Sequence, residues 1–447
     1  MRVSYTETTY KNNIRKTIEH NLTTIKDTDR ENNLINIYPQ MEYQKLEGFG
    51  GAVTDSAGYV FSLLNEEQKS EMVNQYFSTE NMAYNQVRIP IDSCDFSLEH
   101  YEADSDPDDT EFQKFSFARV EKYILPLLDA AEKAYGDKLD IMLSPWSTPA
   151  YMKTTGERNH GGKLKPEYRK RWAEYICRYI EEYRNRGYHV AKLTMQNEPK
   201  AVQTWDSCIY TAEEQKEFLR DYLWPSLKAH GLDDIGIYLW DHNKERVFEW
   251  AETIIDTETT SMIRGMAFHW YSGDHFEALR MIREKYPDKQ LLLSEACIEY
   301  SKFSADDYLN NAQKYAHDMM GNLNEGMNTF LDWNLILNEE GGPNHVGNFC
   351  DAPYLFDRDS KELKESNILG YLWHFTHFLE PGAVRIGVSR YTDKLEVTAF
   401  EKDDKIIFVI LNRTDEELTA HICLGEYCTE ITVQPKSIGS GVMTEWK

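Results

Sequence analysis

The stretch Leu193-Thr194-Met195-Gln196-Asn197-Glu198-Pro199 decides how the rest of the sequence is interpreted. It begins as a short apolar strand and ends in two amides, a carboxylate and a proline. Pro199 has no N–H for a strand ladder, and it disfavours helical angles at the residue before it. We therefore expect Glu198 at the mouth of a strand. A carboxylate there is either a catalytic acid or a structural hydrogen-bond acceptor, and the rest of the chain has to decide between them.

Strand-like apolar runs alternate with helical patterns from Gly48 onward. The expected strands lie near Gly48–Val53, Gln86–Ile91, Asp140–Pro145, Ala191–Gln196, Ile235–Trp240, Gly265–Trp270, Gln290–Ser294 and Thr329–Trp333. The expected helices lie near Glu66–Phe77, Phe117–Tyr135, Pro166–Arg186, Ala212–His230, Lys244–Ile255, Phe276–Tyr286, Ala305–Leu323 and Ser366–Phe378. This alternation implies parallel strands joined by right-handed crossovers, and eight such units close into a (β/α)8 TIM barrel, an α/β fold.

Both ends of the chain have a different pattern. Residues 1–46 are polar with short alternating pieces and predict one or two strands, whereas residues 382–447 predict an antiparallel sandwich or sheet. Its expected strands are Leu395–Phe400, Ile406–Leu411, Thr419–Cys423 and Glu430–Val433. The N-terminal strands have no partners of their own, so we expect them to join this sandwich. The predicted domains are residues 1–46 and 382–447 for the β-sandwich and 47–381 for the barrel.

Composition excludes several classes of partner. The chain has 447 residues and a formal net charge of -26, without a basic patch. Nucleic acid is therefore excluded as a partner, and anionic membranes and polyuronic substrates would be repelled, which favours a neutral carbohydrate substrate. No apolar run is long enough to insert into a membrane. The sequence is compatible with a homo-oligomer.

The N-terminus and the cysteines predict a cytoplasmic protein. Met1–Asp29 is polar and has no apolar core of a signal peptide. The seven cysteines show no CxxC spacing, which favours reduced thiols. Cys423 and Cys428 are close enough to bridge a hairpin, but we expect two free thiols there.

Polar and aromatic side chains stand at nearly every expected strand end, where barrel enzymes carry their chemistry. These residues are Arg88, Asp92, Asp95, Trp146, Asn197, Glu198, Asp241, His242, His269, Trp270, Tyr271, Ser294, Glu295, Asp332, Trp333 and Asn334. One polar strand end would be unremarkable, but a ring of carboxylates, amides and indoles predicts a site.

Glu198 and Glu295, at the ends of strands four and seven, face each other across the expected barrel. That arrangement suits glycoside hydrolysis, in which one carboxylic acid protonates the leaving oxygen and the other carboxylate attacks the anomeric carbon. Retention of configuration requires the two carboxyl groups to be about 5–5.5 Å apart. We expect Glu198 to be the acid/base and Glu295 the nucleophile, while Asn197 binds the sugar 2-hydroxyl.

Neighbouring residues are expected to support these two. Tyr271 would keep Glu295 ionised through a hydrogen bond, and Arg88 would lower the pKa of Glu295 by its charge. Trp146 and Trp333 would flank the sugar, and Asp95 would accept hydrogen bonds from its hydroxyls. His269 is expected to act as a further supporting residue.

The same residues allow other interpretations. Arg88 and Glu295 could form only a structural ion pair. His242, His269 and Asp241 could suggest a metal, but no HxH or HExxH spacing supports one, so no metal is expected. Trp270 and Cys297 are expected to pack in the core, and Ser294 lacks the GxSxG pattern of a nucleophilic serine.

Several longer motifs resemble one known family. They are Glu47-Gly48-Phe49-Gly50-Gly51-Ala52-Val53-Thr54-Asp55, Ser93-Cys94-Asp95-Phe96-Ser97, Ser144-Pro145-Trp146-Ser147-Thr148-Pro149, Gln196-Asn197-Glu198-Pro199, His269-Trp270-Tyr271, Ser294-Glu295-Ala296-Cys297, Asp332-Trp333-Asn334 and Gly341-Gly342-Pro343-Asn344. Together they resemble glycoside hydrolase family 30, the glucosylceramidase family. The resemblance implies a retaining β-glycosidase without a cofactor, and a barrel fused to a β-sandwich built from both chain ends.

Carried over position by position, the resemblance makes Glu198 the acid/base and Glu295 the nucleophile. It assigns the sugar site to Asp95, Trp146, Asn197, Tyr271 and Trp333, with Asn348 in a loop that lines the entrance. His345 stands in the same loop, at a position where an aromatic residue is often found in the family.

The predicted function is an exo-acting retaining β-glucosidase, similar to glucosylceramidase, that takes short oligosaccharides or glucosides. The alternatives are a β-xylosidase or β-1,6-glucanase, and a non-catalytic carbohydrate-binding barrel, which would have no need of two opposed carboxylates. We expect a bell-shaped pH profile with a mildly acidic to neutral optimum, because the ionised Glu295 should raise the pKa of Glu198.

Overall fold

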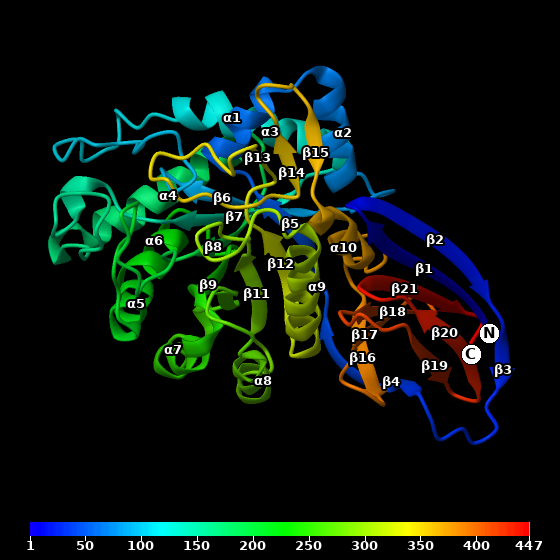
Figure 1. Ribbon diagram of the computed structural model, residues 1–447. Coiled ribbons are helices and arrows are strands. Elements are labelled where there is room, and N and C mark those ends of the chain that lie inside the picture. The colour runs from blue at the N-terminus through cyan, green and yellow to red at the C-terminus, as the bar shows by residue number, and fades with distance from the viewer. Residues whose placement is uncertain (447) are drawn as a thin grey trace.

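A closed barrel of eight parallel strands forms the larger part of the molecule (Figure 1). The computed structural model describes residues 1–446. The barrel strands are β5 (Gly48–Ala52), β6 (Gln86–Ile91), β7 (Asp140–Pro145), β8 (Val190–Thr194), β9 (Gly236–Asn243), β10 (Gly265–His269), β11 (Gln290–Glu295) and β12 (Met327–Asp332). Each pairs in parallel with its neighbour in the chain, and β12 closes the ring against β5. The predicted TIM barrel is confirmed.

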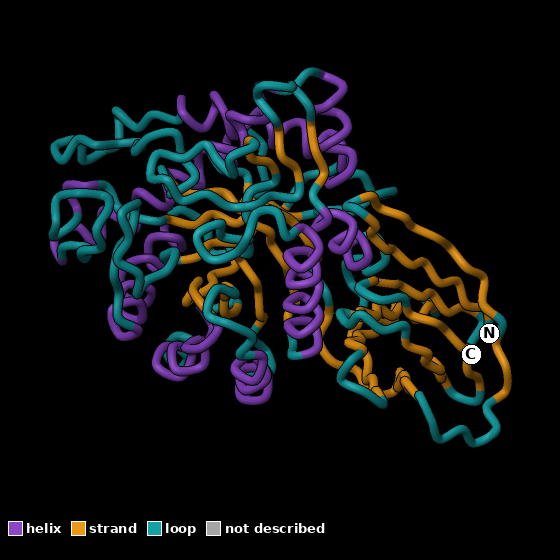
Figure 2. Tube along the Cα trace, viewed as in Figure 1, coloured by secondary structure: helices purple, strands orange, loops and turns teal. Residues whose placement is uncertain are grey.

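Helices surround the barrel, as Figure 2 shows. They are α1 (Asp55–Leu63), α2 (Glu66–Phe77), α3 (Ala118–Tyr135), α4 (Arg169–Asn185), α5 (Ala212–Phe218), α6 (Trp224–Ala229), α7 (Val247–Ile254), α8 (Phe276–Lys285), α9 (Tyr308–Asn324) and α10 (Asn367–Thr376). The sequence did not predict α1, whose N-terminus is capped by Thr54, which accepts a hydrogen bond from the Ala57 N–H. The helix expected at 212–230 is interrupted by a π turn at Leu219–Leu223, which ends two residues before Pro225, a residue that has no N–H to donate.

Both chain ends build a second β-sheet domain, as predicted. Its strands are β1 (Arg2–Lys11), β2 (Ile14–Leu22), β3 (Thr24–Lys26), β4 (Leu34–Lys45), β16 (Val384–Arg390), β17 (Leu395–Lys402), β18 (Lys405–Asn412), β19 (Leu418–Leu424), β20 (Tyr427–Val433) and β21 (Ser437–Thr444). The first strand pairs with the last, which brings the two termini together (Figure 1). Strands distant in the sheet order share one apolar core, so the sheet folds over on itself.

Helix α10 joins the two domains. His374 on this helix contacts the Thr8 hydroxyl of β1 at 2.8 Å and the Ser440 hydroxyl of β21 at 2.9 Å. Tyr371 stacks on Tyr10 of β1 with ring centroids 5.9 Å apart. These contacts fix the sheet domain against the side of the barrel. A small sheet of β13 (Ile336–Asn338), β14 (Tyr354–Phe356) and β15 (Leu363–Glu365) precedes α10.

The expectation of free thiols at Cys423 and Cys428 is wrong, because these residues form a disulfide. They stand directly opposite each other in the β19–β20 hairpin, a register that the spacing alone did not determine. The other five cysteines are buried and free. Among the residues described, no helix combines the length and the apolar character that a membrane span requires.

Candidate active site

A cavity of about 140 Å³ opens among the loops that follow the barrel strands. Eight of the ten residues expected to form the site line it, namely Asp95, Trp146, Asn197, Glu198, Tyr271, Glu295, Trp333 and Asn348. Arg88 and His269 do not line the cavity, but both are fully buried and contact residues that do. The structure therefore brings together all ten predicted site residues.

Glu295 ends strand β11 and is held by two groups. The Tyr271 hydroxyl donates a hydrogen bond to Oε1 at 2.9 Å, and the Arg88 guanidinium lies 2.8 Å from Oε2. Both contacts favour the ionised carboxylate. The side chain keeps only a small exposed surface, which faces the cavity.

Arg88, on strand β6, organises the floor of the site. Besides Glu295 it binds Asp241 at 2.8 Å, and it donates a hydrogen bond to the Asn197 side-chain oxygen at 2.9 Å. The guanidinium lies 4.7 Å from the centre of the Trp146 ring, a cation–π contact. The Arg88–Glu295 ion pair is thus part of a network that also orients Asn197 and Trp146.

Glu198 follows strand β8 in an unusual backbone conformation. Its φ is +47°, in the left-handed region that residues with a side chain rarely adopt. The Glu198 N–H donates to the Asp241 carbonyl at 2.9 Å, and the Asn197 N–H donates to the Pro145 carbonyl at 2.8 Å. These bonds to strands on both sides hold the strained turn in place. Strained backbone of this kind concentrates at functional sites.

His269, at the end of β10, lies between the two glutamates. Its Nδ1 is 3.4 Å from Glu198 Oε1, and its Nε2 is 4.0 Å from Glu295 Oε2. The same Nε2 lies 3.1 Å from Asp241 Oδ1. Asp241 also accepts hydrogen bonds from the hydroxyls of Thr194 and Ser294. A buried Asp241–His269–Glu198 chain therefore leads to the cavity.

The pKa values in this cluster correct one expectation. Burial raises the pKa of Glu198, but the hydrogen bond from His269 and the charges of His242 and His269 outweigh burial and hold this pKa at about 2. Burial would lower the pKa of His269, but the charge of Glu295 and the contacts with Asp241 and Glu198 raise it to about 9. The exchangeable proton thus rests on His269, not on Glu198 as predicted.

The pKa of Glu295 also departs from the expectation. Burial raises it, and this effect exceeds the lowering by the charges of His269 and Arg88 and by the Tyr271 hydrogen bond. Arg88 acts in the expected direction, but it does not bring the pKa of Glu295 below its ordinary value. Burial and the charge of Glu295 likewise raise the pKa of Asp95.

Two indoles and one amide complete the walls of the cavity. Trp146 and Trp333 stack with ring centroids 5.3 Å apart and planes inclined by 20°. Asn348 donates a hydrogen bond to Asp95 Oδ2 at 3.0 Å, which ties the loop after β13 to the loop after β6. Aromatic faces and paired polar groups of this kind suit a sugar ring.

Sequence reasoning missed part of the lining. The residues it did not single out are Gln203, Trp205, Asn243, Glu299, Lys302 and Cys350. His242, one of the predicted strand-end residues, and Cys297, which was expected to pack in the core, also line the cavity. His242 and Asn243 end strand β9, and the others lie in loops without a periodic pattern. Trp270 lies outside the lining and packs in the core, as expected, with its ring tilted by 55° against that of Tyr315.

Comparison with known proteins identifies the family. Residues 46–379 match the glycosyl hydrolase family 30 TIM-barrel domain, and residues 382–440 match the beta sandwich domain of the same family. The lysosomal acid glucosylceramidase of Mus musculus is 31% identical over 404 residues, which cover 86% of this chain and 78% of the mouse protein.

Two solved structures agree with this match. SrfJ from Salmonella typhimurium superposes with a TM-score of 0.95 at 36% identity, and the alignment covers 100% of both chains. An endo-β1,6-glucanase superposes with a TM-score of 0.86 at 26% identity, covering 100% of this chain and 99% of the glucanase. The chain therefore belongs to glycoside hydrolase family 30 and is a glycoside hydrolase of the retaining type.

Proposed function

We propose that the chain is an exo-acting retaining β-glucosidase, with Glu295 as nucleophile and Glu198 as acid/base. The observation that carries this proposal is that both carboxylates line one small cavity and contact opposite nitrogens of a single imidazole, that of His269. Such a pair supports double displacement, whereas a binding protein would have no use for two opposed carboxylates.

The reaction has two steps. In the first, Glu295 attacks the anomeric carbon while Glu198 gives a proton to the glycosidic oxygen, so that the C–O bond breaks and a glycosyl ester forms on Glu295. In the second, the Glu198 carboxylate removes a proton from a water molecule. The resulting hydroxide attacks the anomeric carbon and releases Glu295 with retained configuration.

His269 supplies the proton for the first step. With Nδ1 3.4 Å from Glu198 Oε1, the imidazolium can pass its proton to Glu198 as the leaving oxygen takes one from the same carboxyl group. Asp241 stabilises the imidazolium through Nε2. After the second step the proton taken from water returns to this pair, so the cycle balances.

The dimensions of the site favour release of a single sugar unit. A cavity of about 140 Å³ is smaller than the roughly 300–1,000 Å³ of clefts that enclose drug-sized ligands, so it suits one ring of the substrate. The net charge of -26 favours a neutral glucoside. The similarity to a glucosylceramidase supports glucose as this ring.

A β-1,6-glucanase is the second candidate. The similarity to an endo-β1,6-glucanase over the entire chain favours the β-1,6 linkage as part of the substrate range. Both candidates cleave a β-glucosyl bond and use the same two carboxylates, and they differ in whether the chain is cut from its end or internally.

Nitrophenyl glycosides and defined oligosaccharides test the proposal. We expect the highest kcat/KM on nitrophenyl β-glucoside over the β-xyloside, and release of glucose from gentiobiose. Preference for the xyloside would contradict the sugar assignment. Early appearance of mixed oligomers from a β-1,6-glucan, without a prior rise in glucose, would favour the endo-acting alternative.

Azide rescue tests the two catalytic assignments separately. Glu295→Ala should lose roughly 10⁴–10⁶-fold in kcat, as in other nucleophile knockouts, and azide should restore turnover with an α-glycosyl azide as product. Glu198→Ala should yield the β-glycosyl azide, because azide then replaces the water of the second step. Exchanged products would mean that the two roles are reversed.

A further inference from the structure

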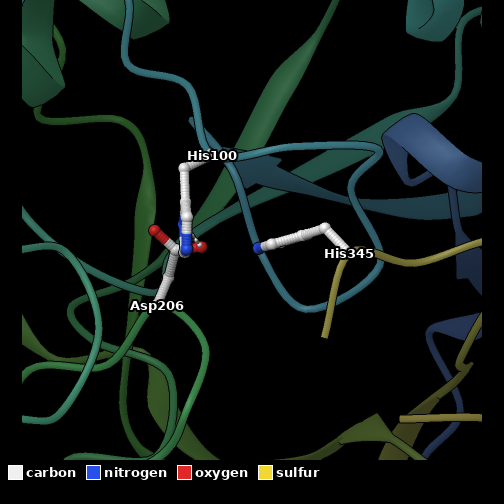
Figure 3. A group of neighbouring side chains, drawn as sticks. All are labelled: His100, Asp206 and His345. Atoms are coloured by element: carbon white, nitrogen blue, oxygen red, sulfur yellow. Dashed lines mark hydrogen bonds and ion pairs between the residues drawn. The ribbon is translucent and has the colours of Figure 1, made fainter. Parts of the chain in front are cut away.

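A cluster of two histidines and one aspartate lies beside the active site and takes no part in the proposed chemistry (Figure 3). His100 belongs to the loop after β6, Asp206 to the loop after β8, and His345 to the loop between β13 and β14. One ligand atom of each lies within 4.8 Å of the other two. Figure 3 shows the His345 ring pointing from its own loop toward the other two side chains.

His345 offers a free lone pair to this cluster. Its Nδ1 lies 2.8 Å from the Ser97 carbonyl oxygen, which can only accept, so Nδ1 carries the proton and Nε2 does not. This Nε2 is buried and has no hydrogen-bond partner among residues 1–446. A buried nitrogen without a partner requires an explanation, and the backbone bond on Nδ1 is the arrangement that fixes a metal-binding tautomer.

The Asp206 carboxylate is held in place by hydrogen bonds to one of its two oxygens. Its Oδ1 accepts hydrogen bonds from Arg158 at 2.6 Å and from the Ser93 hydroxyl at 3.1 Å, while Oδ2 faces His100 Nδ1 at 3.2 Å. The positive charge of Arg158 is shared with Asp92 at 3.5 Å and Glu102 at 3.6 Å. The surroundings therefore stay negative enough for a cation at Oδ2.

We propose that His100, Asp206 and His345 bind a zinc ion, with water completing the coordination. Two imidazoles and one carboxylate match the donors that zinc accepts in sites with three protein ligands, whereas Mg²⁺ and Ca²⁺ prefer oxygen donors alone. His100 is 40% exposed and provides the access path from solvent.

The zinc would hold three loops of the active-site entrance together. Asp95 lies in the same loop as His100, Trp205 directly precedes Asp206, and Asn348 lies three residues after His345. All three neighbours line the cavity. The ion is thus structural, and it positions the cavity wall without touching the reacting atoms.

A second cluster of Glu198, His242 and His269 also meets the distance criterion. It is the weaker candidate, because both nitrogens of His269 already contact carboxylates, at 3.4 Å and 3.1 Å. Zinc there would have to displace those contacts, whereas Nε2 of His345 has none to lose.

Calorimetric titration of the EDTA-treated, dialysed enzyme with ZnCl₂ tests the proposal. We expect one tight site, a rise of a few degrees in Tm with Zn²⁺, and neither effect with Mg²⁺ or Ca²⁺. His345→Ala and His100→Ala should each weaken zinc binding at least 100-fold. His160→Ala, which removes an exposed histidine that contacts Glu157, should bind zinc like the wild type.

The position of the zinc site is tested with the His242→Ala variant and with crystals soaked in zinc. The His242→Ala variant should keep the tight site, and anomalous density should lie between His100, Asp206 and His345. Equal zinc affinity of wild type and His345→Ala, loss of binding in His242→Ala alone, or density only at His269 would each overturn the proposal. None of these results depends on which sugar the enzyme cleaves.

Discussion

At the scale of single residues, the proton held by His269 explains how Glu198, which is itself ionised at neutral pH, can still act as the general acid. The pKa of Glu198 lies at about 2 and that of His269 at about 9, so the pair carries one proton at neutral pH. General acid catalysis requires this proton to reach the leaving oxygen. The structure thus divides the role assigned to Glu198 between two neighbouring groups.

The pH dependence of kcat/KM follows from the pKa shifts of His269 and Glu295. As pH rises through about 9, His269 loses its proton and the first step loses its acid. As pH falls, Glu295 becomes protonated at a pH above that of an ordinary glutamate, because burial raises its pKa, and the nucleophile is lost. We therefore expect kcat/KM to be bell-shaped, with its alkaline limb near pH 9. An alkaline limb near pH 6 would contradict the assignment to His269.

His269→Asn tests the proton supply directly. We expect kcat/KM to fall roughly 10²–10⁴-fold on alkyl glucosides, the usual contribution of a general acid. The loss should be much smaller on dinitrophenyl glucoside, whose leaving group needs no proton. An equal loss on both substrates would indicate that His269 only holds the structure of the site.

Tyr271→Phe tests the support of the nucleophile. The variant removes a hydrogen bond of 2.9 Å to Glu295 that lowers its pKa. We expect the acid limb of the pH profile to move to higher pH and kcat to fall about 10-fold, in line with about 1.5 kcal/mol for a hydrogen bond to a charged group. Tyr183→Phe, whose hydroxyl is buried without a hydrogen-bond partner among the described residues, is the matched control and should leave the profile unchanged.

At the scale of elements, strand ends were predictable and loops were not. Alternation of apolar runs with helical patterns determines where Glu198 and Glu295 must lie, since the carboxyl ends of parallel strands meet at one face. Helix α1 was missed because its nine residues include Gly58 and follow a glycine-rich strand closely. Cavity residues such as Trp205 and Lys302 lie in loops, where position depends on contacts that no local pattern encodes.

The β19–β20 hairpin shows that cysteine pairing could not be predicted from the sequence either. A spacing of five residues fits a disulfide as well as two thiols, and only the strand register places Cys423 opposite Cys428. Closing so short a loop should stabilise the protein by about 2 kcal/mol. We expect Cys423→Ser to lower Tm by a few degrees with unchanged kcat/KM, and added reductant to have no further effect on this variant. A loss of activity would contradict the separation of the hairpin from the site.

At the scale of the whole molecule, the junction between barrel and sheet domain contains a buried histidine. Burial lowers the pKa of His374 to about 3, helped by the charges of Arg15 and His377. The ordinary pKa of histidine is about 6.5, so below that pH the unfolded chain binds a proton that the folded chain does not. This contribution to stability is complete above pH 6.5 and is lost as pH falls toward 3.

Unfolding at different pH values tests this contribution. From His374 alone, we expect the free energy of unfolding to fall by about 1.4 kcal/mol per pH unit between pH 6 and pH 4. His374→Gln should flatten this slope, at the cost of lower stability at pH 7, since its amide cannot titrate. The same slope in variant and wild type would show that other groups cause the acid sensitivity.

Double displacement requires Glu295 to form a covalent bond to the sugar. Incubation with 2-deoxy-2-fluoro-β-D-glucosyl fluoride slows the second step more than the first, so the glycosyl ester should accumulate and can be located by mass spectrometry of peptides. We predict one sugar per chain, on Glu295, and no label in Glu295→Ala. A label on Glu198, or full inactivation without any labelled peptide, would contradict the central claim.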